Sequence, residues 1–171
     1  MRPDLFYPSP LGEGRILVLI DTFTTDKRCM DGRTKLAKLD FFLRYPSYLS
    51  MALVKLGKAQ ISTIPAETDN IESRMIRFRF GPWDPSYFSI IGSLVGRGLV
   101  VPVKLTNGIG YRTTELGNKT AKKLSIHPAW LGISYNATLL KKFLDKSGNW
   151  LKTFIYQNFQ EIVSVEMGES I

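Results

Sequence analysis

The stretch of residues 75–124 constrains the fold of this chain more than any other, because it reads as a strand, a helix, a hairpin and a second helix. Polar and apolar residues alternate over 75–80, which is the period of a half-buried strand, and Gly81-Pro82 is expected to end that strand. Asp84-Pro85 supplies an N-cap and a proline in the first turn, and Gly98 supplies a C-cap, so a helix is predicted between them. The apolar stripe expected to face the core from that helix consists of Phe88, Ile91, Leu94 and Val95.

A hairpin and a further helix complete this stretch. Residues 99–105 are β-branched and apolar, residues 106–110 are typical of a turn, and residues 111–113 return. Thr114 is placed to cap the next helix. A helix, a hairpin and a helix in this order form the ending of a winged-helix domain. We therefore predict an α+β, mainly α fold. Residues 1–126 form a winged helix-turn-helix domain, of which residues 1–14 are an N-terminal arm or loop. Residues 127–171 form additional C-terminal helices packed on this domain.

Three helices are expected upstream, the last of them a short one over residues 47–53 that closes near Gly57. The apolar run at residues 16–20 also fits a buried strand, but the winged-helix pattern needs a helix over residues 15–23. A second helix is predicted over residues 31–45, capped by Asp31 or Thr34 and ended by the proline that follows. Its inward residues are expected to be Leu36, Leu39, Phe42 and Leu43. Its solvent-facing residues are expected to be Lys35, Lys38 and Arg44.

The C-terminal part carries a heptad-like seam of residues spaced three or four apart: Leu140, Leu144, Ser147, Leu151, Phe154 and Asn158. The sequence Ser147-Gly148-Asn149 predicts a break between two helices. Large aromatic residues also cluster near the Gly81-Pro82-Trp83 corner. Such residues ordinarily form the core, and the alternative is a surface that binds a protein partner. The candidates for partner binding are Trp83, Tyr87, Leu140, Leu144, Leu151 and Phe154.

The composition is that of a soluble globular protein, with 171 residues, 44% hydrophobic and 22% charged. No apolar run approaches the ~20 residues that a membrane-spanning helix needs, so no membrane association is predicted. The N-terminal residues lack the apolar segment of a signal peptide, and the single Cys29 has no internal disulfide partner, so a cytoplasmic location is predicted. The net charge of +8 favours an anionic partner, either a nucleic acid or an acidic protein surface.

The titratable residues do not predict an enzyme. The one histidine, His127, and the one cysteine lie far apart in the sequence, without the companions of a catalytic triad or a metal site. The segment Gly117-Asn118-Lys119-Thr120 differs from a phosphate-binding loop, which has a glycine directly before Lys-Thr. We therefore predict no catalytic activity, no bound metal and no cofactor.

Nucleic-acid binding is the harder alternative to reject. A winged helix that reads DNA usually presents Arg, Lys, Asn or Gln from its recognition helix, but the helix expected over residues 84–97 has Arg97 as its only cation. The basic residues lie elsewhere, and their ordinary role is to face solvent. The candidates for nucleic-acid contact are Arg77, Arg79, Lys119, Lys122 and Lys123. Further cations, Lys141, Lys142 and Lys146, lie in the C-terminal helices.

Three blocks carry a resemblance to a known family: residues 31–46 (DGRTKLAKLDFFLRYP), 77–83 (RFRFGPW) and 97–100 (RGLV). Over residues 10–125 the chain resembles the middle component of bacterial three-component ABC-ATPase systems, the small subunit of Lamassu-type anti-phage defence. The resemblance implies a non-enzymatic adaptor that links an SMC-like ATPase to an effector such as a nuclease, and it supplies no catalytic residue. The alternative that the residues leave open is a sequence-specific winged-helix transcriptional regulator.

Overall fold

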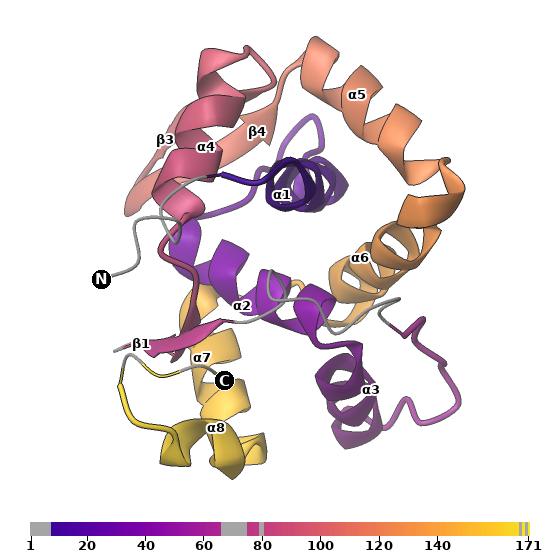
Figure 1. The fold of residues 1–171 in the computed structure, drawn as a ribbon, viewed down its shortest axis with the longest axis vertical. Coiled ribbons are helices and arrows are strands. Elements are labelled where there is room, and N and C mark those ends of the chain that lie inside the picture. The colour runs from indigo at the N-terminus through magenta and orange to yellow at the C-terminus, as the bar shows by residue number, and fades with distance from the viewer. Residues whose placement is uncertain (1–7, 66–74, 79–80, 168, 170) are drawn as a thin grey trace.

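The computed structural model describes residues 8–65, 75–78, 81–167, 169 and 171, and shows an α+β protein that is mainly α-helical (Figure 1). The helices are α1 (Pro10–Phe23), α2 (Arg33–Arg44), α3 (Pro46–Lys55), α4 (Tyr87–Gly96), α5 (Glu115–Ser125), the 3₁₀ turn η3 (Pro128–Trp130), α6 (Leu131–Phe143), α7 (Gly148–Asn158) and α8 (Gln160–Ser164). The strands are β1 (Ile76–Phe78), β2 (Gly81–Trp83), β3 (Val100–Leu105) and β4 (Gly108–Thr113). None of the helices in the described ranges combines the length and the apolar character that crossing a bilayer requires.

Helix α1 lies at the centre of the upper half of the molecule, where Figure 1 shows it end-on among α4, β4, α5 and α6. The expected choice of helix over strand for residues 16–20 is confirmed, and all five of these side chains are buried. The helix begins earlier than predicted, because the Ser9 hydroxyl accepts a hydrogen bond from the Gly12 N–H at 3.0 Å and Pro10 occupies the first turn. Residues 10–14 are therefore helical and not part of an arm.

Helix α2 packs against α1, α3, α6, α7 and β2, so it is enclosed on every side. The four apolar residues predicted to face inward are all buried. The prediction that Lys35, Lys38 and Arg44 face solvent is wrong, since all three are buried as well. Its predicted side-chain cap is also absent, and the helix begins after Gly32, whose φ of 101° a glycine adopts without strain.

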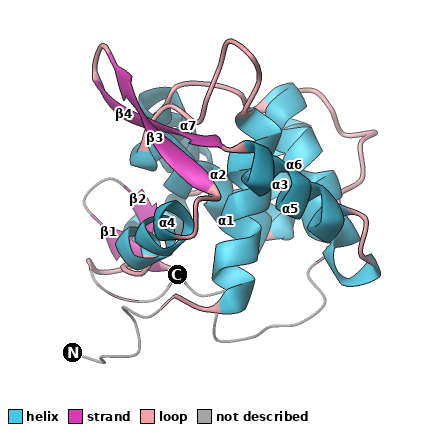
Figure 2. Ribbon diagram, turned by 90° about the horizontal axis from the view of Figure 1, so that it is seen from above, coloured by secondary structure: helices cyan, strands magenta, loops and turns pink. Residues whose placement is uncertain are grey.

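Two short antiparallel hairpins complete the fold. Strand β1 ends at Phe78, before Gly81-Pro82 as predicted, but Gly81 and Pro82 then belong to a partner strand, β2, which was not predicted and which pairs Trp83 with Ile76. Proline is tolerated there because each strand of an isolated pair has one edge without a ladder partner. Strands β3 and β4 form the predicted second hairpin with a two-residue turn, since Leu105 pairs with Gly108. Figure 2 shows this longer hairpin beside α4.

The local signals at the ends of α4 and α5 act largely as predicted. Gly98, at φ 69°, donates its N–H to Val95 O while Leu99 donates to Leu94 O, which is the Schellman arrangement at a helix end. Thr114 caps α5 by accepting a hydrogen bond from the Gly117 N–H at 3.0 Å. The prediction that Asp84 caps α4 is wrong: the helix begins at Tyr87 with Ser86 at its N-cap, and the Asp84 carboxylate instead accepts hydrogen bonds from the backbone and hydroxyl of Ser86.

The C-terminal helices share the core of the rest of the molecule. Helix α6 packs on α1 and α2, and α7 packs on α2 and β2. The predicted break between α6 and α7 is confirmed, with Ser147 capping α7 through the Trp150 N–H at 3.2 Å. The proposed boundary between residues 126 and 127 falls between α5 and η3, and the division of the chain there remains a prediction.

Candidate protein-interaction surface

The outward face of α4 is apolar and uncharged. Phe88, Gly92, Val95 and Gly96 are exposed on it, and we call these four residues the α4 surface. Phe88 is 60% exposed and Val95 37% exposed, although both were predicted to face the core. The inward residues are Tyr87, Ile90, Ile91 and Leu94, which follow the i, i+3, i+4, i+7 spacing of a helix buried on one face. The buried face of α4 is therefore rotated by one residue from the predicted face, and its i, i+3, i+4, i+7 pattern is present in the sequence.

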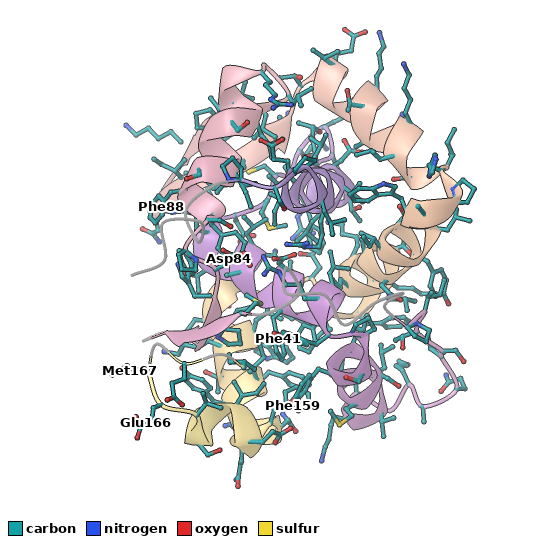
Figure 3. The ribbon with its side chains drawn as sticks, viewed as in Figure 1. Phe41, Asp84, Phe88, Phe159, Glu166 and Met167 are labelled. Atoms are coloured by element: carbon teal, nitrogen blue, oxygen red, sulfur yellow. The ribbon has the colours of Figure 1, made fainter. Side chains whose placement is uncertain are left out.

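Aromatic and guanidinium groups surround Phe88. The Trp83 ring lies 5.2 Å from the Tyr87 ring at an interplanar angle of 84°, and 6.2 Å from the Phe88 ring. The guanidinium carbon of Arg33, in the first turn of α2, lies 4.4 Å from the centre of the Phe88 ring. Figure 3 shows Phe88 at the periphery of the molecule and Asp84 further in, toward α2. The exposed ring is thus held between a tryptophan and an arginine, residue types that dominate protein interfaces.

A buried ionic network fixes α4 against α1 and α2. Asp40 of α2 is fully buried and accepts hydrogen bonds from Arg15 Nε at 2.6 Å, Arg44 Nε at 2.9 Å and the Tyr87 hydroxyl at 2.7 Å. Arg44 also donates to the Asp84 carboxylate that precedes α4. Two arginines and two aspartates therefore balance one another inside the protein, which is the condition for burying charge. Arg44 was predicted to face solvent because the burial of Asp40, its partner on the same helix, depends on Arg15 and Tyr87 of other elements.

The pKa values of this network favour its charged form. Burial by itself would raise the pKa of Asp40, but Arg15 and Arg44 outweigh burial and lower it from 3.8 to about 2. Burial and the Asp40 charge raise the pKa of Tyr87 well above 10.0, so its hydroxyl keeps the proton that it donates. The network is accordingly a fixed scaffold for α4 at neutral pH and offers no titrating group for acid–base chemistry.

Most of the predicted partner-binding residues do not reach the surface. Tyr87, Leu140, Leu144 and Leu151 are fully buried, and Phe154 is almost fully buried beneath the Trp150 ring, stacked at 5.0 Å. The seam is core because α6 and α7 turn it toward α1 and α2, so its proposed contact with a partner is corrected here. Trp83 alone of the six is partly exposed, beside the α4 surface.

Three of the five predicted nucleic-acid candidates lie together on α5. Lys119, Lys122 and Lys123 are exposed on α5, as expected, and Lys119 pairs with Glu115 at 2.7 Å. The side chain of Arg77 and the whole of Arg79 lie outside the described residues. Contact of any of these residues with nucleic acid remains a prediction.

Strand addition to the β3–β4 hairpin is disfavoured by its sequence. Tyr111 exchanges both backbone hydrogen bonds with Met30, each at 2.9 Å, so Tyr111 turns these groups away from β3. Its cross-strand neighbour Pro102 must then occupy the outer edge of β3. Proline has no N–H to offer an incoming strand, and this is a common way of blocking an exposed edge. The α4 surface is therefore the better candidate for binding a protein.

The two residues considered for catalysis have ordinary surroundings. His127 is exposed, and its Nδ1 accepts a hydrogen bond from the Ala129 N–H at 3.2 Å, while Cys29 is partly buried in the loop before α2. Within the part of the chain that the structure describes, no three His, Cys, Asp or Glu residues are grouped as metal ligands would be. Searches against protein-family models, curated proteins and solved structures found no match to this chain. The α4 surface, supported by the Asp40 network, is thus the candidate site for binding a protein.

Proposed function

We propose that this chain is a non-enzymatic adaptor that binds a protein partner through the α4 surface, as a subunit of an SMC-like ATPase complex of anti-phage defence. In that role it links the ATPase to its effector, a nuclease. The observation that supports this most directly is an exposed phenylalanine, stacked by Arg33, on a helix face without charge. The resemblance of residues 10–125 to the small subunit of Lamassu-type systems is the basis for proposing an SMC-like ATPase complex.

We also propose that α1, α2, α4 and the β3–β4 hairpin form a winged helix, in which α4 takes the place of the recognition helix. A recognition helix that reads base edges needs Arg, Lys, Asn or Gln on its outer face. The sequence of α4, YFSIIGSLVG, contains none of these residues. The same position in the fold is therefore better suited to an apolar protein surface than to the major groove.

Burial of the α4 surface by a partner should be energetically favourable, as at the centre of a protein interface. Burying the exposed part of Phe88 would contribute roughly 1–2 kcal/mol from apolar area alone. Gly92 and Gly96 leave open space above the helix, so a partner backbone can approach it closely. Because the buried network already holds α4 in place, little conformational entropy remains to be lost on binding.

The test is co-purification with any coiled-coil ATPase that is encoded beside this chain. We expect the wild-type chain to be retained by the tagged ATPase and Phe88→Glu to lose at least about tenfold in affinity, because a charge would be buried. The matched control is Leu116→Glu, since Leu116 is similarly exposed, at 56%, but lies on α5. Equal retention of the two variants would contradict the use of α4, and a stable lone chain with no such neighbour would contradict the adaptor itself.

The second candidate is a sequence-specific DNA-binding regulator, which the exposed Lys119, Lys122 and Lys123 after the hairpin favour. A regulator should bind one duplex much more tightly than others, with an affinity that falls steeply with salt. A panel of duplexes measured at several salt concentrations separates the two candidates. Discrimination of at least about a thousandfold would establish the regulator and reject the adaptor as the main function.

A further inference from the structure

A second surface of opposite chemistry forms where three distant segments meet. Arg112 of β4 donates hydrogen bonds from Nη2 to the carbonyls of Thr25, Asp26 and Arg28, at 2.7, 3.3 and 3.2 Å. The loop at residues 24–30 is therefore held against the hairpin. On its other side, Arg28 Nη1 lies 3.2 Å from Asp145 at the end of α6. These contacts bring cations of the loop, of β4 and of α6 into one region.

Asp145 is the centre of this region. Besides Arg28, its carboxylate accepts hydrogen bonds from Lys35 at 2.7 Å and from Lys141 at 2.8 Å. Burial by itself would raise the pKa of Asp145, but the hydrogen bonds from Lys141 and Lys35 lower it below 3.8. One carboxylate therefore holds three cations close together, with Asp31 as a second partner for Lys35 at 2.7 Å.

The charge balance of this region is strongly positive. Its cations, which we call the basic surface, are Lys27, Arg28, Lys35, Arg112, Lys141, Lys142 and Lys146. Against these seven stand Asp26, Asp31 and Asp145, which leaves +4, half of the net charge of +8 of the whole chain. Lys27, Lys142 and Lys146 are exposed, and the Arg28 side chain is 63% exposed. These four side chains are the part of the basic surface that a partner in solution can reach, since Lys35 is buried and Arg112 and Lys141 are only partly exposed.

The basic surface has few of the apolar groups that a protein interface needs at its centre; the exposed one beside it is Val101, the cross-strand neighbour of Arg112. None of the large hydrophobic residues exposed in the described part of the chain belongs to the loop at 24–30 or to residues 141–147. A protein interface usually has an apolar core inside a polar rim, whereas binding to a phosphate backbone is carried by Lys and Arg through counterion release. The chemistry of this surface therefore fits a nucleic acid better than an acidic protein.

We propose that the basic surface binds the phosphate backbone of a nucleic-acid duplex without reading its sequence. This inference does not rest on the α4 surface, since it uses different residues and a different kind of interaction. It also differs from the recognition-helix mode, because the contacts come from a loop, a strand and the end of α6. Backbone contact of this kind positions a protein on a duplex but carries no base specificity.

The test is fluorescence anisotropy of a labelled DNA duplex of about 20 base pairs with the full chain, over a range of salt concentrations. The variant is the triple charge reversal Lys27→Glu, Lys142→Glu and Lys146→Glu. The matched control is Lys55→Glu, Lys58→Glu and Arg97→Glu, near the C-terminal ends of α3 and α4, which changes the net charge by the same amount. Circular dichroism establishes that each variant is folded, and a triple Lys→Gln variant of the basic surface replaces the charge reversal if it is not.

We expect the variant of the basic surface to bind at least about tenfold more weakly near 0.1 M salt, and its salt slope to fall by roughly 3. The control triple should change affinity by less than about threefold, because the charges that it reverses lie on other elements and are screened by salt. Equal losses in both triples, or no binding by the wild-type chain at low salt, would overturn the proposal. Phe88→Glu should leave DNA affinity unchanged, so a failure here is distinct from a failure of the adaptor function.

Two further arms identify the source of the phosphates. An RNA duplex of the same sequence shares the phosphodiester chemistry, and the tighter of the two duplexes indicates the natural ligand. Polyglutamate carries negative charge without phosphate and should compete poorly at equal charge concentration. Equal competition by polyglutamate would show that the surface binds any polyanion, and would contradict the assignment to nucleic acid.

Discussion

Lys38 offers the sharpest test of the packing, because it is a lysine placed inside the protein without a counter-ion. Its side chain is 1% exposed, and Nζ donates a hydrogen bond to Pro82 O at 3.0 Å. Among the residues that the structure describes, no carboxylate lies within ion-pair distance of it. Burial, with the charge of Lys152 added, lowers the pKa of Lys38 from 10.5 to about 7.

The sign of the pH dependence follows from these two pKa values. Below about pH 7 both the folded and the unfolded chain hold the Lys38 proton, and between about 7 and 10.5 only the unfolded chain holds it. The unfolded state then binds more protons, so the free energy of unfolding rises with pH through this window. At ~1.4 kcal/mol per pKa unit, the rise between about pH 6 and about pH 9 is roughly 3 kcal/mol.

The perturbation that isolates this effect is Lys38→Met, which keeps the length of the side chain and removes the titrating amine. We expect urea unfolding curves to show that the variant lacks the rise of roughly 3 kcal/mol between about pH 6 and about pH 9. At acid pH the free energy of unfolding of Lys38→Met should therefore exceed that of the wild type. The difference is reduced by ~1 kcal/mol, because the variant lacks the hydrogen bond to Pro82 O. The control, Lys55→Met, removes an exposed lysine from α3 and should follow the wild type at every pH. If the curves of wild type and Lys38→Met ran parallel, the reasoning from burial would be wrong.

Four other substitutions test the packing. Asp40→Asn should lower the free energy of unfolding in urea by roughly 3–5 kcal/mol, since it leaves two buried arginines without their carboxylate. In the wild type, the contribution of Asp40 should be lost as pH falls from about 4 to about 2, and ellipticity during acid titration checks this. Gly117→Ala should strongly lower the melting temperature in thermal unfolding, because the added Cβ would lie 1.9 Å from Leu99 O. Gly92→Ala has open space around the added Cβ and should raise the free energy of unfolding by about 1 kcal/mol through helix propensity. Leu39→Ala should cost ~2–5 kcal/mol in urea as a core deletion, and a negligible loss would refute the orientation of α2.

The sequence predicted those features whose causes are local. Ser147, Thr114 and Gly98 each act on groups within a few residues of themselves, so their capping roles can be read from neighbouring letters. The hairpin of β3 and β4 likewise depends on a short turn between two apolar runs. Helix α1 was the one ambiguous case, and the requirement of the overall pattern for a helix resolved it correctly.

The charged residues of α2 show where such reading fails. A lysine or arginine on a helix is normally placed in solvent, and that rule is wrong for Lys35, Lys38 and Arg44. Lys35 binds Asp31 and Asp145, Lys38 binds Pro82 O, and Arg44 binds Asp40 and Asp84. Three of these five partners lie far away in the sequence. Because only the folded chain brings these groups together, no local pattern identifies a buried charge of this kind.

The candidate surfaces were hidden from the sequence for two different reasons. Phe88 was misplaced by a helix phase that was one residue out, an error that a stricter fit of the i, i+3, i+4, i+7 pattern would have removed. The basic surface was not visible at all, since Arg28 and Asp145 are separated by more than a hundred residues. The orientation of Phe88 can therefore be predicted from the sequence, whereas the basic surface depends on tertiary contacts between distant segments.

The two surfaces meet at the first turn of α2, which raises the question of whether they influence one another. Arg33 lies over Phe88, and Lys35, two residues later, binds Asp145 of the basic surface. Coupling between sites requires an element with two alternative arrangements, but α2 is buried on all sides and fixed by the Asp40 network. We therefore expect the triple charge reversal of the basic surface to leave affinity for the protein partner within about twofold of wild type, a coupling below ~0.4 kcal/mol. A larger change in the co-purification assay would mean either that α2 moves between two positions or that the partner also contacts the basic surface.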